Sequence, residues 1–194
     1  MPPASDPPRR MRIVGTSGSG KSHLAALVSA RTGLPRLDLD AVFWDEGWTY
    51  RDLDEAREFI REFVAAHPGG WVSDGNWTHR RGDLLEPGTP GGPDVLVWID
   101  HPRSVVMRRV IWRTLRRALT REELWHGNRE RMSSWLRWSP DENILRWAWT
   151  NHPVMRERMQ RRIAAGDPVV HLRGQRDVDA WLAALPAIGR SVGG

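Results

Sequence analysis

The chain has 194 residues, 40% of them hydrophobic, and a formal net charge of +5. This length predicts one domain with enough apolar material for a core, and the absence of cysteine excludes disulfides and thiolate metal sites. The positive charge favours anionic ligands such as nucleotides. Residues 1–10 lack the apolar segment of a signal peptide, and no apolar run is long enough to span a membrane, so we expect a cytoplasmic protein without a membrane partner.

Strands and helices are expected to alternate along the chain. In order, we predict a strand at 12–14, a helix at 21–31, a strand at 34–40, an aromatic loop at 41–50, a helix at 52–66, a strand at 71–74, a polar loop at 78–93, a strand at 94–100, a helix at 102–119, an interruption at 120–132, a helix at 141–165, a strand at 168–172 and a helix at 177–185. This α/β order predicts a parallel sheet covered on both faces. Residues 11–185 would form the domain, with flexible tails at 1–10 and 186–194.

The clearest motif lies between the first predicted strand and the first predicted helix. Residues 15–22 match the phosphate-binding pattern G-x-x-x-x-G-K-S. Glycines let backbone N–H groups converge on phosphate oxygens, and the following helix directs its positive end at the same anion. Lys21 is the only lysine among 29 basic residues and is expected to bind the donor phosphates, while Ser22 would ligate Mg²⁺. The ATP-binding residues predicted here are Gly15, Thr16, Ser17, Gly18, Ser19, Gly20, Lys21, Ser22 and His23.

Carboxylates follow two of the predicted strands. Asp38 and Asp40 would point the same way at the end of one strand, and Asp74 ends another. Ligands of parallel α/β sheets bind at the carboxyl ends of the strands, so these side chains would lie along one rim with the phosphate loop. We expect Asp40 to orient the phosphoryl acceptor and Asp74 to help Ser22 place Mg²⁺. A helix cap or a tight turn is the alternative role for each carboxylate.

The acceptor is expected to bind beside these carboxylates. An aromatic loop carries Trp44 and Trp48, which would line either a substrate pocket or an interface. Asn76 follows the strand that ends in aspartate and is assigned to the same substrate site. Arg80 and Arg81 would clamp a phosphate or carboxylate of the acceptor, or else remain as solvated charge.

Arginines crowd the helix predicted at 102–119 and the segment that follows it. They are Arg108, Arg109, Arg113, Arg116, Arg117 and Arg121, of which positions 109, 113, 116 and 117 share one face. Arginines on a mobile element stabilise the charge of a transferring phosphoryl group, so we expect a lid at about 117–135 whose Arg116, Arg121 and Arg129 contact phosphate. A solvated basic face is the alternative. Arg173, after the last strand, is expected near the nucleobase.

These motifs together resemble a known family. Its pattern is matched by residues 15–22, 39–44 with Trp48, 71–77, 100–103, 124–130 and 170–173. Over about residues 11–185 the chain is similar to the adenylate-kinase-like P-loop NTPases of the DNA topology modulation protein family. The resemblance implies the nucleoside-monophosphate-kinase fold, a three-layer α/β structure with a five-stranded parallel sheet in the order 2-3-1-4-5, and binding of ATP and Mg²⁺.

The chain also departs from related patterns at two places. His23 follows Ser22 where threonine is frequent in the family, and Asp74-Gly75 is followed by Asn76-Trp77-Thr78 where adenylate kinases have Phe-Pro-Arg. The second difference argues against AMP as the acceptor. We therefore predict an ATP- and Mg²⁺-dependent phosphotransferase with an unidentified small-molecule or nucleotide acceptor, and NTP hydrolysis as its fallback activity. The alternative is an ATP-binding regulatory or nucleic-acid-associated NTPase without such an acceptor; nucleic acid is not the favoured partner, and the sequence leaves the oligomeric state open.

Overall fold

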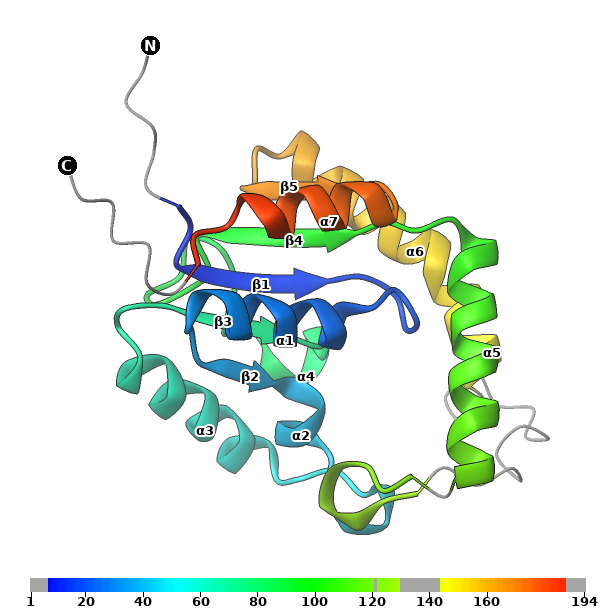
Figure 1. Cartoon of the computed structure of the whole chain (residues 1–194). Coiled ribbons are helices and arrows are strands. Elements are labelled where there is room, and N and C mark those ends of the chain that lie inside the picture. The colour runs from blue at the N-terminus through cyan, green and yellow to red at the C-terminus, as the bar shows by residue number, and fades with distance from the viewer. Residues whose placement is uncertain (1–6, 121, 130–143, 188–194) are drawn as a thin grey trace.

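The computed structural model describes residues 7–120, 122–129 and 144–187 (Figure 1). Its centre is a parallel sheet with the strand order β2-β3-β1-β4-β5, as the sequence predicts. The strands are β1 (Arg10–Val14), β2 (Arg36–Asp38), β3 (Trp71–Asp74), β4 (Val95–Ile99) and β5 (Val169–Leu172). Asp38 pairs with Asp74 in the β2–β3 register, which brings both carboxylates to the carboxyl edge of the sheet.

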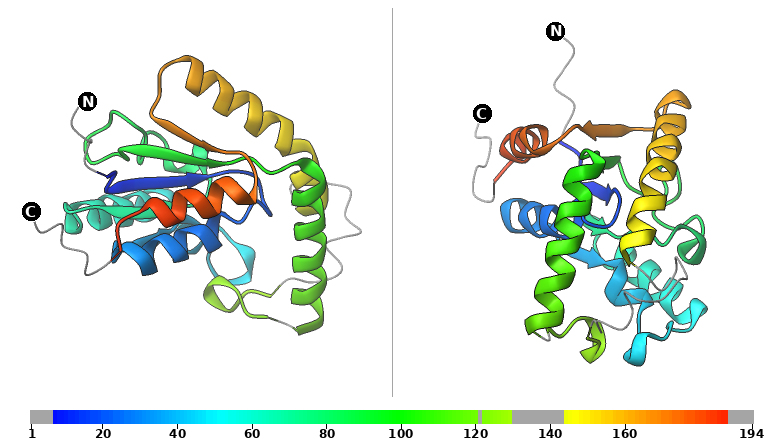
Figure 2. Two further views of the ribbon diagram at one scale, coloured as in Figure 1. Left: turned by 45° about the horizontal axis from the view of Figure 1, so that its top comes forward. Right: turned by 90° about the vertical axis from the view of Figure 1, so that its right-hand side faces the viewer.

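Helices cover both faces of this sheet (Figure 2). On one face lie α1 (Lys21–Thr32) and α7 (Gln175–Ala184), and on the other lie α3 (Leu53–Ala66) and α6 (Ile144–Ala164). Side chains alternate along a strand, so Ile13 of β1 packs with α1 whereas Val14 packs with α6. The two apolar layers fix the position of the carboxyl edge, where the loops that carry the predicted site emerge.

Local sequence explains where the helices of this edge begin. Asp52 accepts hydrogen bonds from the backbone N–H groups of Asp54 and Glu55, which caps α3. The helix α5 (Arg103–Thr120) starts directly after Pro102 and stands across the carboxyl ends of the strands in Figure 1. It therefore faces the loop between β1 and α1.

Two short helices occupy segments that the sequence analysis assigned otherwise. The strand predicted at 34–40 ends at Asp38, and α2 (Leu39–Phe43) follows, because the Asp38 side chain accepts the N–H of Asp40 and caps the new helix. The statement that both aspartates point the same way on a strand is therefore wrong. The loop predicted at 78–93 begins with α4 (Thr78–Arg81).

The segment predicted as a lid is described in part. Residues 117–120 belong to α5, and residues 122–129 form a loop closed by a bridge between Glu123 and Arg129, with the single turn η2 (Trp125–Gly127) at its tip. A similar closed loop, residues 44–50, carries the turn η1 (Glu46–Trp48) and the bridge between Trp44 and Tyr50. Arg121 and residues 130–135 of the predicted lid lie outside the described residues. Among the described helices, none combines the length and apolar character needed to cross a bilayer.

Candidate functional site

The phosphate loop joins β1 to α1 in a conformation that depends on glycine. Gly18 and Gly20 have φ of 80° and 95°, in the left-handed region that other residues disfavour. A Cβ on Gly18 would also lie 2.4 Å from the Val110 side chain of α5. Gly20 precedes α1 without a side-chain cap, so the first N–H groups of the helix can serve an anion instead.

Lys21 opens α1 and reaches back across the loop. Its Nζ donates a 3.0 Å hydrogen bond to the carbonyl oxygen of Thr16. Burial lowers the pKa of Lys21, whereas the nearby charges of Asp40 and Asp74 act to raise it. The one ammonium side chain of the protein is thus held in the loop, within electrostatic reach of two carboxylates.

Two arginines of α5 contact the same loop. Arg109 Nη1 donates to the carbonyl oxygen of Ser19 at 3.3 Å, and Arg113 Nη2 donates to Ser17 Oγ at 3.0 Å. They reach one loop because they lie four residues apart on one face of the helix. Their guanidinium groups add positive charge where the helix N-terminus already favours an anion.

Asp38 and Asp40 lie at the start of α2, and each accepts an indole N–H. Asp38 Oδ2 accepts from Trp125 Nε1 at 3.0 Å, and Asp40 Oδ1 accepts from Trp77 Nε1 at 2.6 Å. Burial raises the pKa of Asp40, although the charge of Lys21 and the indole hydrogen bond oppose this effect. A buried carboxyl group of raised pKa beside a phosphate loop is suited to accept a proton.

Asp74 ends β3 with one satisfied and one unsatisfied oxygen. Its Oδ1 accepts from Arg36 Nε at 2.9 Å, and Arg36 also pairs with Asp38 at 3.5 Å. Its Oδ2 is buried and has no hydrogen-bond partner. Such an oxygen can accept from a water that surrounds Mg²⁺, with the Ser22 hydroxyl on the first turn of α1 as a direct ligand. No three acidic or histidine side chains of the described residues gather around a metal position.

The residues after β3 connect these groups. Asn76 Nδ2 donates to the carbonyl oxygen of Gly15 at 3.0 Å. Gly75 has φ of 108°, and a Cβ there would lie 2.8 Å from the Leu39 Cβ of α2. The close approach of residue 75 to α2 places the indole of Trp77 against Asp40.

Aromatic side chains cluster beside Asp40. Trp44 contacts Trp48, Tyr50 and Trp77 with ring centroids 5.4, 4.8 and 5.3 Å apart. Arg80 lies on this cluster, its Cζ 4.7 Å from the centroid of the Tyr50 ring. Its Nη2 donates to the backbone, but its buried Nε has no partner. The predicted substrate residues Trp44, Trp48 and Arg80 thus belong to one aromatic cluster that reaches Asp40 through Trp77, whereas Asn76 contacts the phosphate loop.

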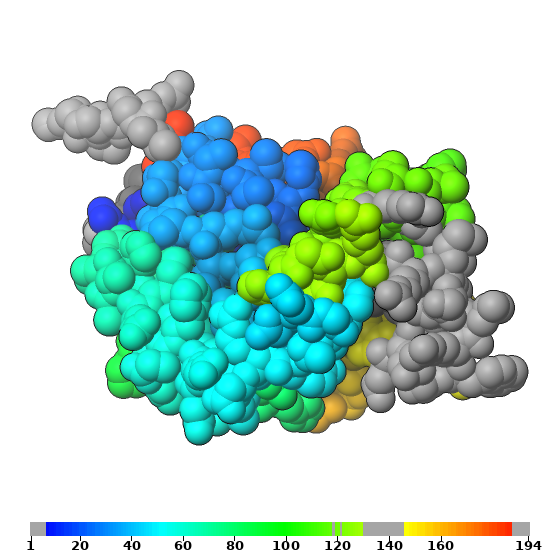
Figure 3. Space-filling view, turned by 90° about the horizontal axis from the view of Figure 1, so that it is seen from below, coloured from blue at the N-terminus to red at the C-terminus, as the bar shows by residue number. Residues whose placement is uncertain are grey.

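The 122–129 loop lies directly against the 44–50 loop, as Figure 3 shows. Asn128 joins them twice: its Oδ1 accepts the backbone N–H of Trp48 at 2.9 Å, and its Nδ2 donates to the carbonyl oxygen of Asp45 at 2.7 Å. The Trp48 indole donates to the carbonyl oxygen of Arg129 at 3.2 Å. These contacts, together with the Trp125–Asp38 bond, close one side of the site.

Comparison with solved structures supports this architecture. A candidate kinase from Chloroflexus aurantiacus aligns with 91% of this chain and 95% of its own at 18% identity and a TM-score of 0.51. This is the fold of the P-loop kinases. Two further structures are similar. A gluconokinase from Sinorhizobium meliloti aligns with 91% of this chain and 92% of its own, at 20% identity and a TM-score of 0.49. A sugar kinase from Janibacter sp. aligns with 91% of this chain and 94% of its own, at 17% identity and a TM-score of 0.48. No family model matches the sequence, and no curated protein matches it at a significant level.

Within this P-loop kinase fold, some predicted residues lie away from the loop. Arg81 is 1% exposed and contacts Glu86 and three carbonyl oxygens inside the protein, so its guanidinium does not face the acceptor side. Arg116 is exposed and pairs with Glu122 at 2.6 Å. Arg129 pairs with Glu123.

Two predicted nucleotide residues lie at the margin of the site. His23 is exposed on the first turn of α1. Arg173 follows β5, where its backbone N–H donates to Asp177 at 2.7 Å and its Nε donates to His171 Nδ1 at 3.3 Å. His171 in turn hydrogen-bonds Asp100 at 3.0 Å. Arg173 is therefore held at the carboxyl end of β5 by its neighbours.

Several residues lie in the site although the sequence analysis did not assign them to it. Arg109 and Arg113 contact the loop, although Arg116, Arg121 and Arg129 were preferred. The shared helical face of positions 109 and 113 was the available signal. Arg36 precedes Asp38 by two positions on β2, so the period of a strand would have placed it beside the carboxylates. Nothing in the pattern marks Trp77 and Trp125 as partners of Asp40 and Asp38.

Proposed function

We propose that this protein is an ATP- and Mg²⁺-dependent phosphotransferase that acts on a hydroxyl group of a small molecule. The observation that carries the proposal is that Lys21, held in the phosphate loop, lies within electrostatic reach of Asp40, a buried carboxyl of raised pKa. Lys21 and its loop would hold the donor phosphates, and Asp40 would accept the proton of the attacking hydroxyl. The P-loop kinase fold supports this assignment.

The donor half uses charge and backbone groups that the chain supplies itself. Lys21, Arg109 and Arg113 would neutralise phosphate oxygens, and the N–H groups at the start of α1 would donate to them. Ser22 and the free Oδ2 of Asp74 fit Mg²⁺ with its waters. When bound, the metal would neutralise charge on the transferring phosphoryl group.

The acceptor half would lie between α2 and the aromatic cluster. Asp40 would orient the hydroxyl, and the free Nε of Arg80 would donate to a polar group of the acceptor. The 122–129 loop would act as the described part of a lid, since it already contacts the 44–50 loop and Asp38. Exclusion of water by this loop would favour transfer over hydrolysis.

The test is nucleotide binding and turnover by the whole chain and by Lys21→Ala. The variant should lose phosphate transfer and hydrolysis while it keeps the circular dichroism spectrum of the parent. Arg61→Ala is the matched control, because Arg61 is an exposed cation on α3 that pairs only with Glu58 among the described residues. Normal turnover in Lys21→Ala would refute the proposal.

The acceptor can be sought with the same protein. Hydroxylated metabolites and nucleosides are screened for thermal stabilisation in the presence of a non-hydrolysable ATP analogue. A true acceptor stabilises the folded state by mass action, and its effect should disappear in Asp40→Ala. Hydrolysis of ATP with no stabilising compound would instead favour an NTPase.

A further inference from the structure

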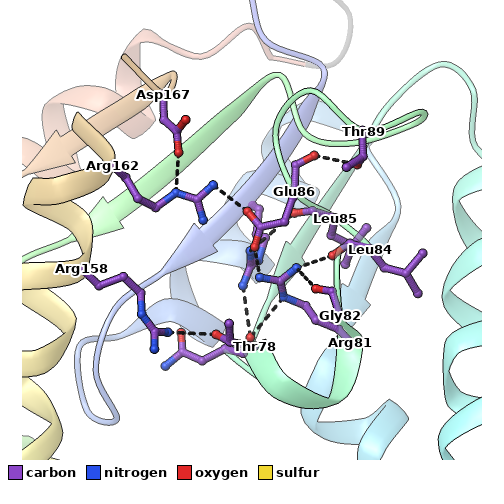
Figure 4. Close-up of polar contacts among 12 residues, drawn as sticks. Thr78, Arg81, Gly82, Leu84, Leu85, Glu86, Thr89, Arg158, Arg162 and Asp167 are labelled. Carbon is purple, nitrogen blue, oxygen red and sulfur yellow. Dashed lines mark hydrogen bonds and ion pairs between the residues drawn. The ribbon is translucent and has the colours of Figure 1, made fainter. Parts of the chain in front are cut away.

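Four arginines converge on the sheet face opposite α1, beside the site described above, with which they share Asn76 (Figure 4). Arg12 comes from the central strand β1, Arg81 from α4, and Arg158 and Arg162 from α6. Arg12 is 3% exposed and Arg81 is 1% exposed, so both guanidinium groups have left water. A charged group in the interior needs opposite charge and hydrogen bonds to compensate for lost hydration.

The carboxylates of this cluster are fewer than its arginines. Glu86 pairs with Arg12 at 3.3 Å, with Arg162 at 2.6 Å and with Arg81, while Asp167 pairs with Arg162 at 2.5 Å. The four cations thus meet two anions. Among the described residues Arg158 pairs with no carboxylate and donates only to Thr78 Oγ1, at 3.0 Å.

Arg12 is the arginine of this cluster that lies on the central strand, and burial acts on its charge. Burial lowers the pKa of Arg12 to about 9, and the charge of Arg81 acts in the same direction. Its Nη groups donate to the carbonyl oxygens of Leu85 and Asn76. Its Nε is buried and has no hydrogen-bond partner. The cluster therefore contains an unused donor as well as unpaired charge.

A cavity lies where these side chains meet. Its volume is about 30 Å³, and the four arginines line it with Asn76 and Thr78. One water needs roughly 10–15 Å³ of such volume, so the space has room for two or three waters or for a small ion. The rest of the lining is aliphatic and methionine side chains.

We propose that this cavity is a binding site for a small monovalent inorganic anion, of which chloride is the probe. Water could fill the space but would leave the charge surplus uncompensated, whereas an anion offsets it and accepts from the free Nε of Arg12. Arg12 also donates to the carbonyl oxygen of Asn76 at 3.1 Å, and Asn76 holds Gly15. The occupant would therefore stabilise the wall on which the phosphate loop rests.

The test is thermal unfolding of the whole chain in sodium chloride and in sodium methanesulfonate at equal ionic strength. Chloride and bromide should raise the melting temperature in a saturable way that the bulky methanesulfonate does not. Arg158→Gln should remove most of this anion-specific shift. Arg161→Gln, an exposed neighbour on α6 that pairs with Glu157, should keep it.

Equal melting curves in the two salts, or a chloride shift that survives in Arg158→Gln, would overturn the proposal. The second outcome would place the anion elsewhere, for instance at the phosphate loop. Should Arg158→Gln not fold, crystals of the parent protein soaked in bromide decide the matter. Anomalous scattering in the cavity supports the site, and its absence refutes it. No nucleotide is used, so the result is independent of the proposed phosphotransferase activity.

Discussion

The side chain of Asn76 donates a 3.0 Å hydrogen bond to the carbonyl oxygen of Gly15, which ties the end of β3 to the first residue of the phosphate loop. On its other side, the carbonyl oxygen of Asn76 accepts from Arg12 at 3.1 Å. Asn76 therefore links the buried arginines to the loop. The sequence analysis assigned this residue to the acceptor, whereas its contacts also give it a role in positioning the donor site.

Asn76→Ala should weaken binding of an ATP analogue about fivefold. The loss of one hydrogen bond costs about 1 kcal/mol net, and here the bond holds the loop in its binding conformation. Isothermal titration calorimetry measures the affinity, with Asn151→Ala on α6 as the control for a change of asparagine to alanine. Equal affinity in Asn76→Ala and the parent would show that the loop holds its shape without this bond.

Asn128→Ala should separate the 122–129 loop from the 44–50 loop. The change removes two hydrogen bonds between them, each worth about 1 kcal/mol, so protection against amide hydrogen exchange should fall about tenfold or more in both loops. Exchange followed by mass spectrometry reports each loop separately. Protection in α1 should stay constant, and a uniform loss across the chain would instead indicate global destabilisation.

Glu86→Gln should destabilise the fold strongly. Three arginines pair with this carboxylate, and removing one partner of a buried ion pair costs about 3–5 kcal/mol because the other charges remain buried. Glu58→Gln is the control, since Glu58 and its partner Arg61 are 59% and 53% exposed and their pair is worth less than about 1 kcal/mol. Urea unfolding measures the free energy of unfolding that each variant loses. Similar losses in Glu86→Gln and Glu58→Gln would contradict the role of Glu86 as the buried partner of three arginines.

The same carboxylate predicts a dependence of stability on pH. Burial would raise the pKa of Glu86, but hydrogen bonding to Arg162 and the charges of Arg12 and Arg81 outweigh it and lower the pKa from 4.5 to about 2. The unfolded state then binds a proton more readily than the folded state. The contribution of Glu86 is complete above pH 4.5 and is lost as the pH falls toward 2. Unfolding curves through this interval should show a steeper loss for the parent than for Glu86→Gln.

Sequence patterns predicted the sheet and the phosphate loop because both depend on local periodicity and on glycine at fixed positions. They did not predict α2, since the short segment from Leu39 to Phe43 suits a strand or a loop as well as a helix, and only the capping contact of Asp38 decides. Nor did they distinguish Arg80, on the aromatic cluster, from Arg81, in the interior. That difference arises from the contact of Arg81 with Glu86, five residues along the chain, which depends on how the loop after α4 folds back.

Asp40→Asn should stabilise the protein at neutral pH while it impairs phosphate transfer. Burial raises the pKa of Asp40 above 3.8, so ionising this carboxyl costs folding free energy once the pH exceeds the folded pKa. Asparagine is neutral and can still accept from the Trp77 indole, so it removes that cost. Thermal unfolding should show a higher melting temperature for the variant at pH 7, and this gain should shrink as the pH falls and vanish below 3.8, where the parent carboxyl becomes protonated in both the folded and the unfolded state.

Asp94→Asn should change the melting temperature at pH 7 in the direction opposite to Asp40→Asn. Burial acts to raise the pKa of Asp94, but hydrogen bonds from the Arg10 backbone and side chain outweigh it, so the pKa is lowered. Removing this charge should therefore lower the melting temperature at pH 7. If Asp40→Asn lowered it as well, the Asp40 carboxylate would be a stabilising partner of Lys21. The proton-accepting role that we propose for it would then lose its physical basis, because such a carboxyl would have a lowered pKa.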